Sequence, residues 1–295
     1  MTKILTIISL LISLASIQAS ASNLPIVIGV LEKPQCIDKA GTIIRALFSK
    51  NNQGWVSLDT ESVFQQYITK SMTWIIAFDG KDEGEIKTID PGFSTEYPWT
   101  FPRDRVLDLS KGQQIPNYPN KLQRFSGWCW APPIRPVIVV SGGGVFDPDI
   151  WKPYKASVEE FDLVFNAFKA KVGSVNICPN SSEKGIPFNY TVKDTEILGG
   201  YKDKAGRKLI SLRFKPLKET DYCGEVVEPE WESHWFLLSD NVSYIGTSLE
   251  LVDAGDYDND GQSEIVFWYS GYNRDGYILI YDNFSRKAEY LWGYH

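Results

Sequence analysis

Five carboxylates are crowded into twelve residues near the end of the chain, in the stretch DAGDYDNDGQSE between Asp253 and Glu264. Carboxylates this close repel one another and disfavour the charged form unless a cation or hydrogen-bond donors offset them. The chemistry open to such a cluster is therefore the binding of a hard cation through oxygen atoms. A solvated acidic turn without an ion is the alternative.

The spacing of the acidic residues favours Ca²⁺. Side chains at loop positions 1, 3, 5 and 9, with a main-chain carbonyl at position 7, can converge on one point if a glycine at position 6 permits a sharp turn. Ca²⁺ takes six to eight oxygen ligands in a flexible shell. The expected ligands, with Gly261 at the turn, are Asp256, Asp258, Asp260, the carbonyl of Gln262, and Glu264.

An EF-hand is excluded, because its loop needs a bidentate glutamate at position 12 and Phe267 stands there. Asp253, three residues before the loop, could support the ligands from behind or cap a turn.

A loop of the form D-x-D-x-D-G-x-x-[DE] that leads directly into a strand resembles the calcium loops of FG-GAP and VCBS repeats, as in integrin-like β-propellers. The flanking segments LELVDAG and EIVFWYSGYNRDGYILIYDNF fit the same pattern over residues 249–283. The resemblance implies a propeller blade at about 249–295 whose calcium is held by the five residues named above. The chain departs from the family in having one clear loop and a glutamate at position 9.

Most of the chain is expected to form short strands, because aromatic and β-branched residues alternate with turn residues. Hairpins are expected at 41–58 and 72–89, and further strands at 135–140, 194–201, 208–214 and from 234 to the C-terminus. One helix is expected at 156–172, with a capping box of Ser157 and Glu160 and a stop at Gly173. The expected fold is mainly β, either propeller-like or another multi-hairpin architecture, with this helix inserted.

The first 21 residues have a basic start, an apolar run and a small-residue end, which are typical of a cleaved signal peptide. We therefore expect a secreted or periplasmic protein whose mature part, residues 22–295, is one β-rich domain without a membrane span. The net charge of −7 disfavours nucleic acid as a partner.

Four cysteines in an exported chain favour two disulfides. Cys36 with Cys129 and Cys178 with Cys223 is the preferred pairing, although the sequence leaves all three pairings open.

The sequence offers few candidate catalytic residues. The histidines are His234 and the C-terminal His295, too few for a zinc site of several histidines. The glycine run after Ser141 lacks the lysine of a phosphate-binding loop and is expected to be a plain loop. The acidic turn at 79–85 is expected to be an exposed hairpin tip. A glycosidase pair of two carboxylates far apart in the sequence is not excluded.

The function expected from these observations is that of an exported calcium-binding protein acting as a binding or interaction module, with the ion in a structural role. Its ligand could be a protein or a carbohydrate, because aromatic residues such as Trp130 and Trp268 could form a stacking platform, although core packing is preferred for them. The alternative is an exported hydrolase acting on a polysaccharide or another extracellular polymer.

Overall fold

The computed structural model describes residues 25–32, 42–68, 71–89, 106–108 (backbone only), 135–178, 185–215 and 233–293. It is mainly β, with 54% of the described residues in strands. This confirms the expected multi-hairpin β class. Within the described residues the sheets do not close into a ring, so the propeller-like variant stays a prediction.

A seven-stranded sheet forms the base of the molecule, with the strand order β3-β2-β1-β7-β4-β5 and with β6 pairing β2. Its strands are β1 (Val27–Glu32), β2 (Ile43–Asn51), β3 (Gly54–Ser57), β4 (Thr73–Phe78), β5 (Lys81–Lys87), β6 (Val106–Asp108) and β7 (Val137–Ser141). Both expected N-terminal hairpins are present, as β2–β3 and β4–β5. Two elements were not predicted from the sequence: β1, which pairs β2 on one side and β7 on the other, and the short helix α1 (Glu61–Tyr67).

A five-stranded sheet has the order β14-β13-β12-β11-β8, and a small hairpin, β9–β10, lies beside it. The strands are β8 (Lys152–Pro153), β9 (Val175–Ile177), β10 (Ile186–Phe188), β11 (Thr195–Lys202), β12 (Lys208–Phe214), β13 (His234–Leu238) and β14 (Val242–Thr247). A short 3₁₀ helix, η2 (Val192–Asp194), precedes β11.

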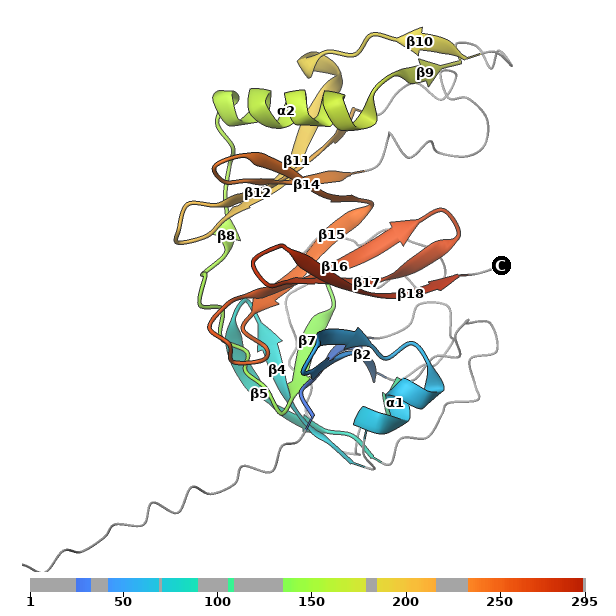
Figure 1. Ribbon diagram of the computed structural model, residues 1–295, viewed down its shortest axis with the longest axis vertical. Helices are drawn as coiled ribbons and strands as arrows, with labels where there is room; N and C mark the ends of the chain where they lie inside the picture. Colours follow the sequence, from blue (N-terminus) through green and yellow to red (C-terminus); the bar gives the residue numbers. More distant parts are fainter. Residues whose placement is uncertain are drawn as a thin grey trace, which may run out of the picture.

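Helix α2 (Val158–Val172) covers the outer face of the five-stranded sheet (Figure 1). Its start is the expected capping box, in which the Ser157 hydroxyl accepts from the Glu160 N–H and the Glu160 carboxylate accepts from the Ser157 N–H. Gly173, with φ 72°, ends it. Phe165 and Phe168 are buried against the sheet, so the aromatic stripe packs in the core as expected.

A four-stranded antiparallel meander lies between the two larger sheets. Its strands are β15 (Leu249–Gly255), β16 (Glu264–Gly271), β17 (Arg274–Tyr281) and β18 (Arg286–Gly293). Along β16 and β17 consecutive residues are buried, because both faces are covered: Trp268 and Tyr277 pack toward the seven-stranded sheet, whereas Phe267 and Ile278 pack toward the five-stranded one. A strand covered on both faces needs an unbroken apolar run such as EIVFWY.

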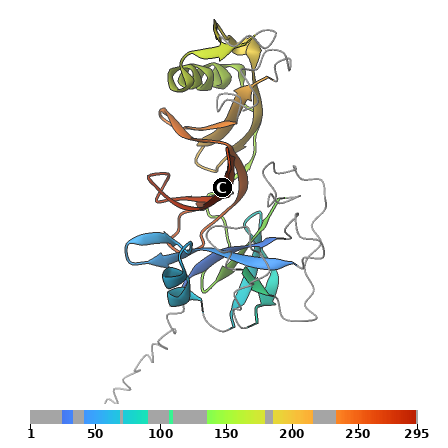
Figure 2. The same ribbon diagram turned by 90° about the vertical axis from the view of Figure 1, so that its right-hand side faces the viewer.

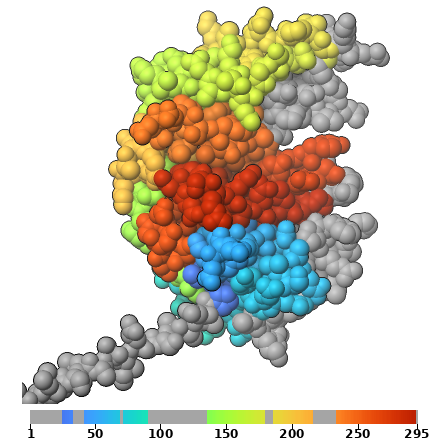
Figure 3. Space-filling model, viewed as in Figure 1, coloured from blue at the N-terminus to red at the C-terminus, as the bar shows by residue number. Residues whose placement is uncertain are grey.

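The layers therefore succeed one another as α2, five-stranded sheet, four-stranded sheet and seven-stranded sheet. The view turned by 90° shows the same stack (Figure 2). In the space-filling view the orange, red and blue bands follow in this order (Figure 3). No helix in the described part of the chain is long and apolar enough to cross a membrane.

Candidate metal centre

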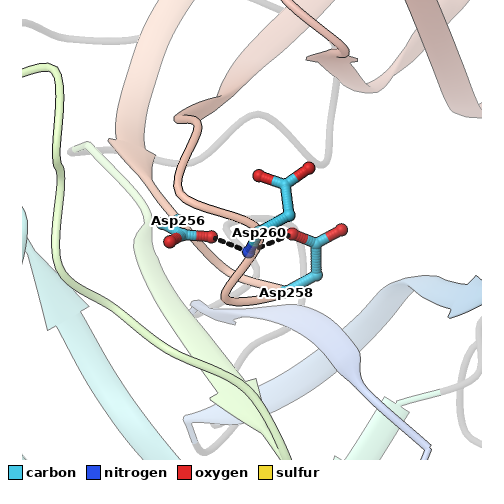
Figure 4. Close-up of side chains that lie close together, drawn as sticks. All are labelled: Asp256, Asp258 and Asp260. Atoms are coloured by element: carbon cyan, nitrogen blue, oxygen red, sulfur yellow. Dashed lines mark hydrogen bonds between the residues drawn. The ribbon is translucent and has the colours of Figure 1, made fainter.

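The acidic loop connects β15 to β16 and brings three of its aspartates together. One carboxylate oxygen from each of Asp256, Asp258 and Asp260 lies within 4.8 Å of the others. Figure 4 shows the Asp260 amide nitrogen between the carboxylates of Asp256 and Asp258, which accept from it at 2.8 and 3.3 Å. The spacing of the aspartates along the loop thus gives a convergent set of side-chain oxygens.

Backbone geometry makes this convergence possible. The loop turns through two residues with positive φ, Asn259 at 61° and Gly261 at 88°, a region that glycine and asparagine enter most readily. The Gly261 N–H donates to the second Asp256 oxygen at 2.9 Å, and the Gln262 N–H donates to Asp260 at 2.8 Å. These bonds hold the carboxylates in place and partly offset their repulsion.

Glu264 lies behind the aspartates, where β16 begins. It is 1% exposed, and one of its oxygens accepts from the Tyr257 N–H at 2.8 Å. Burial, together with the charges of Asp258, Asp260 and Asp256, raises the Glu264 pKa to about 8. Burial also raises the Asp256 pKa. A cation among these groups would act in the opposite direction and favour their ionised forms.

One cation already reaches the loop. Lys50 on β2 forms an ion pair with Asp258. Its ammonium also lies 5.4 Å from the centre of the Trp55 ring and 5.8 Å from that of Tyr281. Burial lowers the Lys50 pKa, but the hydrogen bond and charge of Asp258 outweigh it, so the net shift is upward. The sequence analysis missed this contact, because β2 and the loop lie far apart in the chain.

The glycine run after β7 packs directly against the acidic loop. The Gly144 N–H donates to the Tyr257 carbonyl at 3.1 Å, and the Asp256 N–H donates to the Phe146 carbonyl at 2.8 Å. A Cβ on Gly143 would overlap the Tyr257 carbonyl, and one on Gly144 would overlap Asn259. The run is therefore a loop, as expected, but its glycines permit close approach to the candidate metal centre.

A side-chain clamp closes the other end of the loop. The Ser263 hydroxyl donates to Asp147 at 2.5 Å, and the second Asp147 oxygen accepts from the Trp151 N–H at 2.6 Å. The segment between β7 and β8 thus holds the loop at both ends.

Asp253 does not belong to the converging set. It is buried on β15, 3.3 Å from Arg135, and lines a cavity of about 40 Å³ with Asp79, Trp151 and Tyr201. Burial raises its pKa to about 7, against the lowering effect of Arg135. Asp253 Oδ2 and Trp151 Nε1 have no hydrogen-bond partner among the described residues.

The other residues that the sequence singled out, His234, Trp268 and the acidic turn near Asp79, lie in the core or in a hairpin turn. His234 is buried, with its ring 5.1 Å from that of Phe168 and its Nδ1 3.2 Å from the Tyr244 hydroxyl. Trp268 is 1% exposed and belongs to the core. The turn expected at 79–85 is shorter in the structure: Phe78 pairs with Lys81, so Asp79 and Gly80 form the hairpin tip and residues 81–85 belong to β5. Asp79 pairs with Arg135 at 2.6 Å.

Several sequence predictions fall on residues that are not described. Cys178 is disulfide-bonded, but Cys36, Cys129 and Cys223 lie outside the described residues, so the pairing stays a prediction. The expected signal peptide and Trp130 likewise lie outside the described residues and stay predictions.

Comparisons with protein-family models, with curated proteins and with solved structures find no match to this chain. The resemblance to FG-GAP and VCBS repeats therefore rests on the residues of the loop and its flanking strands.

Proposed function

We propose that this chain is an exported calcium-binding protein that acts as a binding or interaction module, with Ca²⁺ in a structural role. The observation that carries the proposal is the convergence of Asp256, Asp258 and Asp260 within 4.8 Å, beside a buried Glu264. Four carboxylates and one carbonyl, that of Gln262, would supply most of a calcium shell.

The position of the loop supports a structural role for the ion. It joins two strands of the central sheet, and the segment between β7 and β8 packs on it. An ion there would remove the repulsion among the loop carboxylates and fix the contact between the central and seven-stranded sheets. Calcium binding would therefore be coupled to folding.

A thermal scan tests the proposal. The full mature chain is stripped with EDTA and then heated with and without millimolar Ca²⁺. A site that binds only the folded state raises stability by about 2.7 kcal/mol at a hundredfold excess over its Kd. We expect Ca²⁺ to raise the melting temperature, and we expect Asp258→Ala to abolish the rise. Equal melting temperatures in EDTA and Ca²⁺ would overturn the proposal.

The alternative function is an exported hydrolase. Two carboxyl groups with raised pKa values, Glu250 and Asp253, line cavities next to one another on β15. A glycosidase needs one carboxylic acid with a raised pKa and a second, ionised carboxylate across the scissile bond. Turnover of a polysaccharide that is lost in Asp253→Asn would favour this alternative.

A further inference from the structure

A hollow of about 270 Å³ lies between the five-stranded sheet and β15, away from the acidic loop. Its origin is a pair of small residues. Gly199 on β11 and Ser211 on β12 are cross-strand partners. A Cβ on Gly199 would meet nothing within 4 Å. Sheet-on-sheet packing is normally filled by interdigitating side chains, so this pair leaves the interface open.

Aromatic rings form one wall of the hollow. Tyr201 and Trp235 stack with ring centres 6.2 Å apart and planes at 24°. Trp235 is fixed because its indole N–H donates to the Leu249 carbonyl at 2.7 Å. Tyr201 also lines the small cavity beside Asp253, so the two spaces share this wall. The wall is apolar, and the Trp235 contact makes it rigid.

The polar side chains of Ser211, Glu250 and Arg213 line the rest of the hollow. Ser211 is 1% exposed, and its hydroxyl has no hydrogen-bond partner in the part of the chain that the structure describes. Among the described residues, none donates a hydrogen bond to Glu250, whose pKa is raised by burial against the lowering effect of Arg213. Arg213 donates through Nε to Glu196 at 2.8 Å, which leaves its terminal N–H groups for other acceptors. Buried polar atoms without partners are rare, and each needs an explanation.

We propose that this hollow binds a neutral polyhydroxylated ligand of the size of one sugar ring, packed against Tyr201, which the buried Trp235 supports, and hydrogen-bonded to Ser211, Glu250 and Arg213. A hydroxyl can both donate to Glu250 and accept from Arg213. A ligand ammonium group could only donate hydrogen bonds, and the positive charge of Arg213 would repel it. A ligand carboxylate could only accept hydrogen bonds, and the carboxyl group of Glu250 would disfavour it. The volume lies near the lower end for small-ligand sites.

The inference deepens the binding function proposed above, but it does not depend on the calcium loop. None of the residues that line the hollow belongs to the acidic loop. The two proposals can therefore be tested independently. Thermal scans in EDTA and Ca²⁺ test whether the loop binds the ion, and sugar titrations test whether the hollow binds the ligand.

The test is a titration of the full mature chain in Ca²⁺, by ligand-observed NMR, with glucose, galactose, mannose and N-acetylglucosamine. Glucosamine and glucuronate serve as cationic and anionic probes. We expect at least one neutral sugar to bind with a millimolar Kd and more tightly than both charged probes. Ser211→Ala should weaken that binding about tenfold, as the loss of one hydrogen bond to a buried group does. Gly199→Val, which fills the hollow, should abolish it.

Ser243→Ala is the matched control, because Ser243 is exposed on β14 of the same sheet; its binding should equal that of the wild type. Neither Ser211→Ala nor Gly199→Val is expected to unfold the chain, and the melting temperature of each variant verifies this. The proposal is overturned if no neutral sugar binds, if a charged probe binds more tightly, or if Ser211→Ala binds with unchanged affinity.

Discussion

The ammonium group of Lys50 on β2 contacts the carboxylate of Asp258 in the acidic loop, so a side chain of the seven-stranded sheet partly neutralises the candidate metal centre. The same Asp258 oxygens are expected to bind Ca²⁺. Lys50 and Ca²⁺ therefore compete for the carboxylate of Asp258. Replacing Lys50 consequently distinguishes a loop that binds an ion from a loop that Lys50 alone neutralises.

We predict that Lys50→Gln strengthens calcium binding, because the ion no longer displaces an ammonium group from Asp258. Removing one partner of a partly buried pair also leaves the loop carboxylates without their cation, so Lys50→Gln should melt earlier than the wild type in EDTA. Calcium should restore most of this loss. Lys287→Gln is the control, since Lys287 is exposed and pairs only with the neighbouring Glu289 among the described residues. If Lys50→Gln is destabilised equally in EDTA and in Ca²⁺, the loop depends on lysine and not on an ion.

The close approach of the glycine run to the acidic loop gives a second prediction. Gly144→Ala should lower stability by about 1–3 kcal/mol and weaken calcium binding, because the added methyl group overlaps Asn259 and the Asp256 carbonyl and forces the loop to move. Gly199→Ala adds the same methyl group in open space and should be close to neutral. Chemical denaturation with and without Ca²⁺ measures both effects. Equal stabilities of the two variants would contradict the packing described for residues 142–146.

The buried carboxyl of Asp253 predicts a pH dependence. Its pKa rises from 3.8 to about 7 on folding, mainly through burial, with Arg135, Asp79 and Asp147 as its charged neighbours. A raised carboxyl pKa means that the folded state holds a proton that the unfolded state releases. This contribution to stability is therefore full below about pH 4 and is lost as the pH rises to 7. At most it amounts to about 4 kcal/mol.

Asp253→Asn removes this titration while keeping the size of the side chain. The variant should gain stability relative to the wild type as the pH rises from about 4 to 7. Urea unfolding at several pH values, in EDTA, measures the difference. Arg135 keeps its contact with Asp79 in the variant. A difference between the two proteins that does not change with pH would show that Asp253 ionises normally in the folded state.

A buried network joins the seven-stranded sheet to the central one. The Tyr277 hydroxyl donates to Glu32 at 2.7 Å, and Glu32 pairs with Arg45 at 2.6 Å. Tyr277→Phe should cost about 1–3 kcal/mol, because a buried carboxylate oxygen loses its donor. Tyr272→Phe is the control, since Tyr272 is 75% exposed and should change little. Denaturation midpoints of the two variants test this, and equal midpoints would contradict a role for the network in joining the sheets.

Elements whose formation depends on local sequence could be predicted from the sequence. The capping box of Ser157 and Glu160 fixed the start of α2, and the alternation of aromatic and β-branched residues placed β11 to β18. The aspartate spacing likewise predicted that Asp256, Asp258 and Asp260 converge, whereas Glu264, which was expected in the same set, lies behind them. Contacts between residues far apart in the chain could not be predicted from local sequence patterns. The Lys50–Asp258 pair and the hollow at Gly199 and Ser211 both arise from how the sheets stack, which the sequence analysis left undetermined.

The most direct test of the calcium site is equilibrium dialysis of the EDTA-stripped protein, residues 22–295, against radioactive Ca²⁺. We predict that each chain binds one ion in the loop of residues 256–264. This ion should be lost in Asp258→Ala and retained in Asp240→Ala, which changes an exposed aspartate outside the loop. A chain that retains no Ca²⁺ at millimolar concentrations, or one whose bound ion survives Asp258→Ala, would contradict this prediction.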